Sequence, residues 1–434
     1  MPPVPKLFIK TFGCQMNVYD SARMRDALMV HGFQETADPS KADVILLNTC
    51  HIREKASEKL FSELGRLARE KKPKALVVVA GCVVQADGTE ILRRSKLIDI
   101  AIGPQNYHQL PELITQYNRK NGRVLKATFP AESKFDFLPT PQKSTAAAFL
   151  AIQEGCDHFC SYCVVPYTRG CEYSRPMKDV LAEAKALVKA GAKEIMLLGQ
   201  NVNGWHGDAG KDLGDLIREL AKIRDLKRIR YTTSYPSEMT KNLINAHKDT
   251  PKLMPYIHLP IQAGSNKTLK AMNRQYTVEQ YEKIVAAFRK ARPDIAISSD
   301  FIVGFPGETE ADFEETLSLV KRIGYASSYS FKFSARPGTP ASLMKNQISE
   351  EVKTKRLIKL QSVLLAQQKA FNVATIGKEF DVLLTEKGKE RGQLLGYSPY
   401  LQGTIVKAPA KMLGQIVHVK VTGATATALM AKLI

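Results

Sequence analysis

The chain has 434 residues, of which 44% are hydrophobic and 24% are charged. This length predicts roughly two to four domains, and the composition excludes a disordered, collagen-like or coiled-coil protein. The 63 basic and 43 acidic residues give a net charge of +20. Such a surplus favours a polyanionic partner, with a nucleic acid expected before an anionic membrane.

Seven cysteines need an explanation. Residues 1–10 lack the apolar segment of a signal peptide, and no run approaches the ~18 apolar residues of a membrane helix. We therefore expect a cytoplasmic protein that has no membrane segment. In that compartment structural disulfides are disfavoured, so metal binding or redox chemistry becomes the favoured use of the thiols.

The first 118 residues alternate between short apolar runs and segments with helical periodicity. A helix with Asn17 as its N-cap and a stop at Gly32 is expected after the first run. The alternation predicts an α/β domain with a doubly wound parallel sheet, and residues 119–143, rich in proline and polar residues, are expected to be a linker. The predicted strands are Leu7–Phe12, Val44–Leu47, Ala75–Ala80 and Leu97–Ile102.

A second alternation of strands and helices begins after residue 144. Its six repeats predict a (β/α)6 partial barrel, with the chemistry on loops at the carboxyl ends of the strands. A basic helix over Glu350–Phe371 leads to a tail of short alternating strands, which predicts a small β-barrel. We expect three domains: 1–143, 144–372 and 373–434. The predicted barrel strands are Phe149–Ile152, Glu194–Leu198, Arg228–Thr233, Tyr256–Leu259, Ile295–Val303 and Ser327–Phe333, and those of the tail are Phe380–Leu384, Gln393–Tyr397 and Ile416–Val421.

Cys156, Cys160 and Cys163 form a C-x₃-C-x₂-C motif directly after the first predicted barrel strand. Three thiolates hold a [4Fe-4S] cluster with one open iron, which the amino and carboxylate groups of S-adenosylmethionine can chelate. One electron delivered to the sulfonium then releases a 5′-deoxyadenosyl radical. Tyr162, between the last two cysteines, is expected to pack near the adenine. The alternative is a zinc knuckle with His158 as its fourth ligand.

Cys14, Cys50 and Cys82 each directly follow a predicted strand of the first domain. The carboxyl ends of parallel strands lie along one edge of a sheet, so these thiols are expected to converge there. Three ligands again leave one iron open, and we predict a second cluster at this edge. The alternative is that each cysteine is a small buried hydrophobe. Cys171 is expected to be a bystander thiol.

Nearly the whole chain resembles the radical S-adenosylmethionine methylthiotransferase family. The resemblance is weaker in the last 60 or so residues, and Cys171 stands where relatives carry another residue. The family-like segments are GCQMN (13–17), LNTCHIREKA (47–56), GCVVQ (81–85), GCDHFCSYCVVPYTRG (155–170), EYSRP (172–176), LLGQNVN (197–203), HLPIQAGSN (258–266), ISSDFIVGFPGET (297–309) and FSARPGTPA (333–341).

The resemblance implies an N-terminal cluster-binding domain, a central radical SAM barrel and a C-terminal RNA-binding TRAM barrel. It implies two [4Fe-4S] clusters and two molecules of S-adenosylmethionine per turnover, one as methyl donor and one as radical source. The REKA (53–56) and GQNVN (199–203) segments are most similar to members that convert N6-isopentenyladenosine at tRNA position 37 to its 2-methylthio derivative. Gln200, at the end of the second predicted barrel strand, is expected to bind the methionine end of the cofactor, with a loop-ordering amide as the alternative, and Asp300 is expected to bind its ribose hydroxyls.

The expected partners are tRNA, S-adenosylmethionine and an unidentified low-potential electron donor, and we expect a monomer. One competing hypothesis keeps this chemistry, a sulfur-group transfer, on threonylcarbamoyladenosine in tRNA or on an aspartate of a ribosomal protein. A second is a non-catalytic iron–sulfur electron carrier or redox sensor that binds RNA. That second hypothesis explains the cysteines and the charge, but not why both sets contain three ligands.

Overall fold

The computed structural model describes residues 4–51, 54–120 and 122–434, so residues 52–53 of the family-like segment 47–56 lie outside the described part. Contacts divide the chain into two compact units. The first comprises residues 1–142, 154–157 and 164–172, and the second comprises residues 143–153, 158–163 and 173–434. The loop with the C-x₃-C-x₂-C motif therefore contributes Cys156 to the first unit, and Cys160 and Cys163 to the second.

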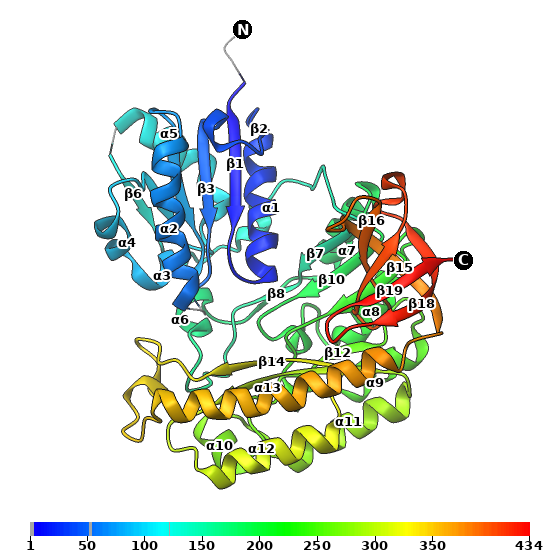
Figure 1. Ribbon diagram of the computed structural model, residues 1–434. Helices are drawn as coiled ribbons and strands as arrows, with labels where there is room; N and C mark the ends of the chain where they lie inside the picture. The colour runs from blue at the N-terminus through cyan, green and yellow to red at the C-terminus, as the bar shows by residue number, and fades with distance from the viewer. Residues whose placement is uncertain (1–3, 52–53, 121) are drawn as a thin grey trace. The chain divides into compact units, whose positions relative to one another are not determined.

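The first unit is built on a six-stranded, wholly parallel sheet with the order β2-β1-β3-β4-β5-β6 (Figure 1). Successive residues of a strand face opposite sides. Thus Val44 and Leu46 pack against α1 and α5, whereas Ile45 and Leu47 pack against α2, α3 and α4. The predicted doubly wound fold is confirmed. Its elements are β1 (Lys6–Thr11), α1 (Gln15–Met29), β2 (Gln34–Glu35), β3 (Val44–Asn48), α2 (Glu54–Glu70), β4 (Leu76–Ala80), α3 (Cys82–Asp87), α4 (Thr89–Arg94), β5 (Ile100–Ile102), α5 (Leu110–Lys120) and β6 (Val124–Lys126).

Two local expectations for this unit were wrong. Asn17 is not the N-cap of α1: Cys14 holds that place, and the Asn17 side chain accepts a hydrogen bond from the Cys14 backbone N–H at 3.3 Å. The expected linker 119–143 also contains structure, because Val124–Lys126 pairs with β5 as an edge strand. Backbone pairing at the sheet edge outweighs the polar composition of this segment.

The second unit contains the six parallel strands of the predicted partial barrel, as the sheets β7-β10-β11 and β12-β13-β14. A parallel bridge joins Ile229 of β11 to Leu253, in the segment that leads into β12. The strands enclose one continuous apolar core with the surrounding helices. The elements are β7 (Ala147–Ala151), α7 (Met177–Lys189), β10 (Glu194–Leu198), α8 (Leu213–Ala221), β11 (Arg228–Tyr231), α9 (Lys241–Asp249), β12 (Tyr256–His258), α10 (Asn266–Ala271), α11 (Val278–Ala291), β13 (Ala296–Val303), α12 (Glu310–Ile323) and β14 (Ser327–Lys332).

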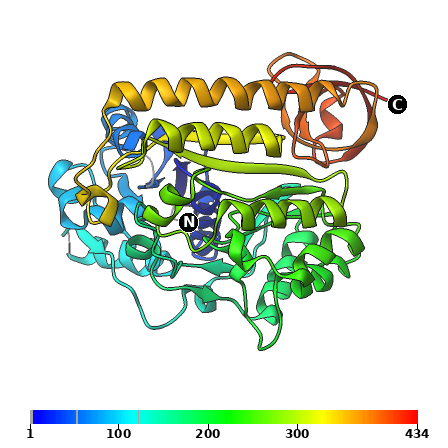
Figure 2. The same ribbon diagram turned by 90° about the horizontal axis from the view of Figure 1, so that it is seen from below.

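Between β7 and α7 lie the short elements β8 (Gln153–Glu154), α6 (Val165–Arg169) and β9 (Tyr173–Ser174), of which α6 belongs to the first unit. At the other end of the barrel, α13 (Glu350–Val373) lies beside α12 and β14 and runs into the C-terminal barrel (Figure 2). That closed barrel has the order β15-β16-β17-β19-β18, as predicted for the tail. Its strands are β15 (Glu379–Lys387), β16 (Gln393–Tyr397), β17 (Gly403–Lys407), β18 (Ile416–Ala424) and β19 (Leu429–Leu433).

Two arginines of β11 fix the C-terminal barrel to the central one. Arg230 donates to the carbonyl oxygens of Ser398 at 2.7 Å and Pro399 at 2.8 Å. Arg228 donates to those of Tyr397 at 2.9 Å and Asp381 at 2.7 Å. Both guanidinium groups are buried, and the Arg230 Nε lies 3.1 Å from a carboxylate oxygen of Glu194. These four hydrogen bonds attach the C-terminal barrel to β11.

Replacement of Arg230 by leucine is expected to lower the free energy of unfolding by about 3–5 kcal/mol, because it leaves the Glu194 carboxylate and two carbonyl groups buried without this partner. Arg218→Leu provides the control, since its ion pair with Asp249 is partly exposed and contributes roughly 0–1 kcal/mol. Urea unfolding of both variants measures the difference. Equal losses would contradict the proposed role of Arg230.

Candidate functional site: two sets of cysteines

The structure brings Cys14, Cys50 and Cys82 to the carboxyl ends of β1, β3 and β4, which are neighbours in the sheet. Cys14 is exposed, whereas Cys50 and Cys82 are buried. The side chains of Cys14 and Cys50 are within hydrogen-bonding reach of one another. This contact and the charge of Arg169 lower the pKa of Cys14 to about 6, although the surrounding protein shields the thiol partly from water and opposes them. Three cysteines separated by more than thirty residues each thus meet at one sheet edge.

Two glycines make this convergence possible. Gly13 and Gly81 directly precede Cys14 and Cys82, with φ angles of 126° and 103° that favour glycine. A Cβ atom at Gly13 would lie 2.5 Å from the Cβ of Cys50, and one at Gly81 would lie 2.3 Å from the carbonyl oxygen of Thr49. The strand ends therefore approach one another more closely than any side chain at these positions would allow.

Replacement of Gly81 by alanine is expected to destabilise the protein more than replacement of Gly32, and to reduce iron binding by the first unit. Both residues have positive φ angles, but a Cβ at Gly32 would meet no atom within 4 Å. Gly32→Ala therefore carries only the conformational cost, roughly 1–2 kcal/mol, whereas Gly81→Ala adds a clash with Thr49. Thermal unfolding and iron analysis of the two variants test this. Equal effects would show that the close approach at Gly81 is unimportant.

Two asparagines, Asn17 and Asn48, form hydrogen bonds at the sheet edge where these cysteines lie. The Oδ1 of Asn17 is 3.2 Å from the Sγ of Cys14, and its Nδ2 donates to the Oδ1 of Asn48 at 3.2 Å. Asn48 in turn donates to the backbone carbonyl of Asn17 at 2.8 Å and to the hydroxyl of Ser21 at 3.0 Å. Both asparagines are fully buried. The family-like segments 13–17 and 47–56 thus contain the residues that orient the cysteines as well as the cysteines themselves.

The second set lies on the loop that follows β7. Within the first unit, the backbone N–H of Cys156 donates to the carbonyl of Gly170 at 3.3 Å. Within the second unit, the N–H of Cys163 donates to the carbonyl of Cys160 at 2.9 Å. None of the seven cysteines, all of which lie in the described part of the chain, forms a disulfide. The three cysteines lie on one loop because only three and two residues separate them in the sequence.

The segment after α10 holds this loop in the second unit. Ser161 donates from its hydroxyl to the carbonyl of Ala271 at 2.8 Å, and its backbone N–H donates to the carbonyl of Met272 at 3.0 Å. The Nδ2 of Asn273 donates to the carbonyl of Phe159 at 3.0 Å. Arg274 is buried, and its Nη1 lies 3.6 Å from the Sγ of Cys160. The periodicity of the sequence did not reveal these contacts.

The His158 ring contacts Glu238 and Tyr235. Its Nε2 lies 2.9 Å from a carboxylate oxygen of Glu238, and its ring stacks on that of Tyr235 with the centroids 3.6 Å apart. This arrangement argues against the zinc-knuckle alternative, in which His158 is the fourth ligand. Within residues 4–51, 54–120 and 122–434, no three His, Cys, Asp or Glu side chains are arranged around a single metal ion. A cubane cluster instead binds each cysteine through a different iron atom.

The three residues expected to bind the cofactor all belong to the second unit. Tyr162 is partly buried and packs against the barrel core, where burial raises its pKa well above the usual value. Gln200 follows β10, and its backbone N–H donates to the Oε1 of Gln153 at 2.8 Å. Asp300 lies in β13 with its Oδ2 3.5 Å from the Nε2 of His258. The buried Oδ1 of Asp300 has no hydrogen-bond partner among the described residues, so it can accept a hydrogen bond from a ligand.

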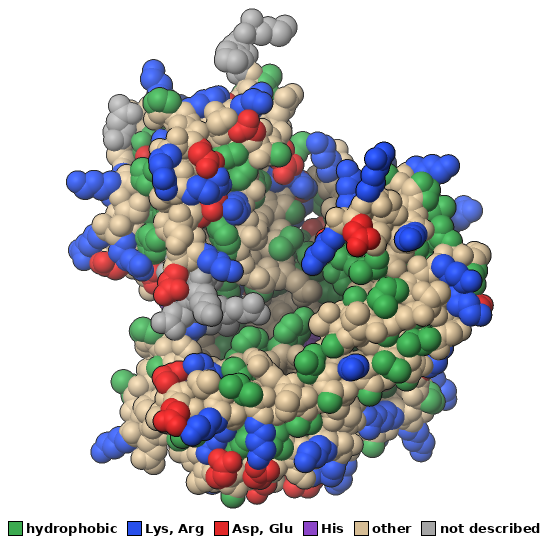
Figure 3. All heavy atoms as spheres, viewed as in Figure 1, with side chains coloured by type: hydrophobic (Ala, Val, Ile, Leu, Met, Phe, Trp, Pro, Cys, Tyr) green, Lys and Arg blue, Asp and Glu red, His purple; other side chains and the backbone are tan. Residues whose placement is uncertain are grey.

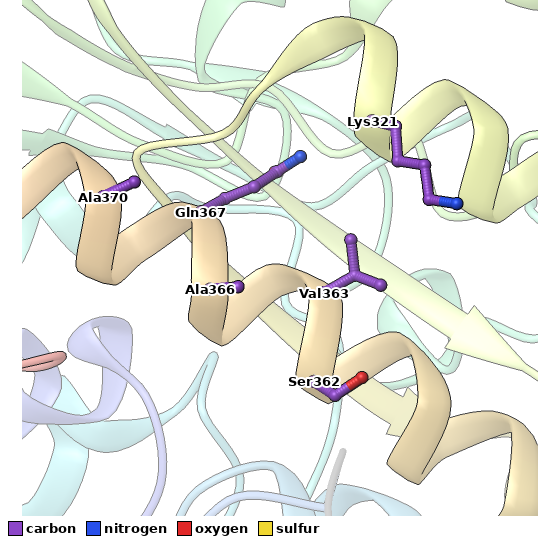
Figure 4. Close-up of a pocket in the computed structure, with 6 residues that line it drawn as sticks. All are labelled: Lys321, Ser362, Val363, Ala366, Gln367 and Ala370. Carbon is purple, nitrogen blue, oxygen red and sulfur yellow. The ribbon is translucent and has the colours of Figure 1, made fainter.

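A groove of about 500 Å³ lies between α12 and α13 (Figure 4). It is formed by other parts of the chain than the residues expected to bind the cofactor. Gln367 on its wall is engaged with the protein itself, donating to the carbonyl of Val320 at 2.8 Å and accepting from the N–H of Tyr325 at 3.0 Å. The lining includes none of the predicted site residues, and we assign the groove no ligand. It is lined by Lys321, Ser362, Val363, Ala366, Gln367 and Ala370.

Comparison with known proteins adds independent information. Residues 6–103 match an uncharacterized protein family, UPF0004, residues 150–320 match the radical SAM superfamily, and residues 373–434 match the TRAM domain. A tRNA-2-methylthio-N(6)-dimethylallyladenosine synthase of Maricaulis maris (strain MCS10) is 52% identical over 442 residues, covering 99% of this chain and 97% of the relative. The protein of that name from Sphingopyxis alaskensis (strain DSM 13593 / LMG 18877 / RB2256) is 54% identical over 434 residues, covering 99% and 98%.

Solved structures with this fold are more distant in sequence. The radical S-adenosylmethionine methyltransferase TsrM from Kitasatospora setae, with cobalamin and a [4Fe-4S] cluster bound, has a TM-score of 0.59 and 14% identity, covering 79% of this chain and 77% of its own. The cobalamin-dependent S-adenosylmethionine radical enzyme OxsB with aqua-cobalamin bound has a TM-score of 0.54 and 12% identity, covering 83% and 56%. These similarities concern the fold alone.

Proposed function

The chain belongs to the family of the tRNA-2-methylthio-N(6)-dimethylallyladenosine synthases, and we propose that it replaces the hydrogen on carbon 2 of N6-isopentenyladenosine at tRNA position 37 with a methylthio group. Carbon 2 of adenine is neither acidic nor nucleophilic, so acid–base chemistry cannot easily make this replacement. Abstraction of the hydrogen by a carbon radical can. The enzyme is therefore a sulfur-group transferase of the radical SAM superfamily.

The observation that carries this proposal is the presence of two three-cysteine sets on one chain. Radical SAM membership implies a [4Fe-4S] cluster and S-adenosylmethionine, for which the C-x₃-C-x₂-C motif provides the ligands. The convergence of Cys14, Cys50 and Cys82 at one sheet edge supports a second [4Fe-4S] cluster with an open iron. A simple electron carrier has no need of an open iron at each of two sites.

Each set of residues has a distinct role in the proposed reaction. Cys156, Cys160 and Cys163 hold the cluster at which S-adenosylmethionine is cleaved, and Tyr162, Gln200 and Asp300 orient that cofactor. Cys14, Cys50 and Cys82 hold the site from which sulfur is transferred. When bound, the clusters supply the electron for cofactor cleavage and a point of attachment for the sulfur.

Each atom and electron of the overall reaction has a source and a destination. The hydrogen from carbon 2 ends on 5′-deoxyadenosine, with methionine as the other fragment of one S-adenosylmethionine. The methyl group comes from a second molecule, which leaves as S-adenosylhomocysteine. The sulfur atom is held at the site of Cys14, Cys50 and Cys82 at the oxidation level of sulfide. A low-potential electron donor supplies the electron consumed in the cleavage, and the site that holds the sulfur would take up one electron when the carbon radical bonds to the methylated sulfur. We propose that one chain is sufficient because both cysteine sets lie on it.

The proposal is tested with reconstituted protein, reductant, S-adenosylmethionine and three anticodon stem-loops: isopentenylated, threonylcarbamoylated and unmodified at the target adenosine. We expect 5′-deoxyadenosine, S-adenosylhomocysteine and a methylthiolated nucleoside with the isopentenylated RNA. Thiolation of the threonylcarbamoylated RNA alone would establish the competing substrate. Cluster reduction without any 5′-deoxyadenosine would instead favour an electron carrier or redox sensor.

The affinity for tRNA is expected to fall steeply as salt is added. Lys and Arg side chains are spread over the face seen in Figure 3, and the net charge of the chain is +20. Each phosphate contact releases counterions, so the logarithm of the binding constant should fall linearly with the logarithm of the salt concentration. Fluorescence anisotropy with labelled tRNA between low and moderate salt measures the slope. A flat response would contradict binding through phosphates.

The described residues include no helix that is both long and apolar enough to cross a lipid bilayer.

A further inference from the structure

Arg169 is a buried residue that joins the cysteine edge of the first unit to two carboxylates. It is the last residue of the short helix α6 and lies within the family-like segment 155–170. Its Nε donates to the Sγ of Cys82 at 3.2 Å. Its Nη1 donates to Glu154 at 2.6 Å, and its Nη2 donates to Asp20 at 2.7 Å. The side chain is 3% exposed, so all three contacts lie away from water.

The charges around Arg169 are balanced within the cluster of four side chains. Lys134, itself buried, lies 2.7 Å from Glu154 and 3.7 Å from Asp20. It also donates to the carbonyl of Pro104 at 2.9 Å. Two cations thus face two carboxylates, an arrangement that buried charges require. Because the two carboxylates hold both terminal nitrogens of the Arg169 guanidinium, its plane is fixed and its Nε–H is directed at the sulfur.

A planar guanidinium suits this task better than an ammonium group. Arginine presents several N–H groups in one rigid plane, whereas lysine is a point charge on a flexible stem. Only the arginine can hold two carboxylates and a sulfur atom at the same time in a fixed geometry. The residue is therefore suited to stabilising negative charge on this sulfur.

We infer that Arg169 is a positioning residue for the sulfur-transfer site: it orients the Cys82 thiolate and sets the reduction potential of the cluster that Cys14, Cys50 and Cys82 hold. This inference rests on the second cluster of the proposed function. Reduction adds negative charge to a cluster, and hydrogen bonds to its sulfurs stabilise that charge. Arg169 therefore raises the potential of this cluster relative to a site without it.

The test uses full-length protein in which Cys156, Cys160 and Cys163 are replaced by alanine, so that only the other three cysteines can bind a cluster. Iron analysis and a redox titration followed by electron paramagnetic resonance give the cluster content and its midpoint potential. In this parent, Asp20→Asn combined with Arg169→Gln removes one charge of each sign. Arg169→Lys keeps the charge but loses the planar geometry.

We expect the parent to bind the iron of one cubane cluster. The potential should be lowered in the Asp20→Asn, Arg169→Gln variant and lowered less in Arg169→Lys. Arg356→Gln is the matched control, because this buried arginine pairs with Glu308 and Glu310 and has no cysteine among its contacts in the described chain. Its replacement should leave the potential of the cluster unchanged.

Three outcomes are decisive. A parent that binds no cluster would overturn the second cluster of the proposed function, and the inference on Arg169 with it. A parent that binds one, with the same potential and spectrum in both Arg169 variants, would overturn the role of Arg169 alone. Circular dichroism shows whether the Asp20→Asn, Arg169→Gln variant folds. If it does not, the Arg169→Lys variant tests the role of Arg169. An unchanged potential in that variant would contradict the inference, and a lowered potential would support it.

Discussion

Replacement of Cys156, Cys160 or Cys163 by alanine is expected to reduce both 5′-deoxyadenosine and the methylthiolated nucleoside to undetectable levels. In the proposed function each of these cysteines is a ligand of the cluster that cleaves S-adenosylmethionine, and we expect a cubane cluster with only two protein ligands not to be retained in a form that can bind the cofactor. Anaerobic assays with separated quantification of 5′-deoxyadenosine and nucleoside measure both products in the same sample.

Cys171→Ser provides the control for these variants. Cys171 is exposed and lies only eight residues beyond Cys163, so it reports on general sensitivity of the region to thiol loss. We expect the serine variant to retain both products. If Cys171→Ser were inactive while Cys160→Ala retained 5′-deoxyadenosine formation, the assignment of the radical cluster to the C-x₃-C-x₂-C motif would be wrong.

Replacement of Cys14, Cys50 or Cys82 by alanine is expected to separate the two halves of the reaction. In the proposed reaction these residues hold the site of sulfur transfer, whereas the radical cluster has its own ligands. The variants should therefore still cleave S-adenosylmethionine to 5′-deoxyadenosine but form no methylthiolated nucleoside. Quantification of the two products in single-turnover reactions shows whether cleavage continues after thiolation has stopped.

The same variants also test the assignment of the sulfur donor. Iron analysis should show the loss of one of two clusters, and circular dichroism should show that the sheet of the first unit is retained. A variant of Cys14, Cys50 or Cys82 that still thiolates tRNA would contradict the assignment. Gly32→Ala, which alters the same unit away from the cysteines, should keep both activities and shows that mild destabilisation does not itself uncouple them.

The central strands β3, β4 and β10 could be predicted because they are buried on both faces and appear as continuous apolar runs. The prediction for Glu194–Leu198 coincides with β10, and that for Val44–Leu47 differs from β3 by one residue. The positions of Cys14, Cys50 and Cys82 after such runs were sufficient to predict their convergence, since parallel strands end at one edge. The topology thus follows from local patterns in the sequence.

The residues that surround the cysteines could not be predicted in this way. Arg169 and Cys82 are 87 positions apart, and no local pattern identifies which of the 63 basic residues is buried beside a thiol. The same holds for Arg274 and Cys160, which are 114 positions apart. The edge strand β6 was missed because its three residues are too few for a periodic signal.

Nucleoside mass spectrometry of total tRNA is the decisive experiment for the proposed methylthiolation. Cells without the gene are compared with the same cells carrying either the intact gene or the Cys82→Ala variant. We expect the 2-methylthio derivative of N6-isopentenyladenosine to be absent without the gene, to be restored by the intact gene and not to be restored by the variant. N6-isopentenyladenosine should accumulate in its place. An unchanged content of the methylthiolated nucleoside in cells without the gene would contradict the proposed function.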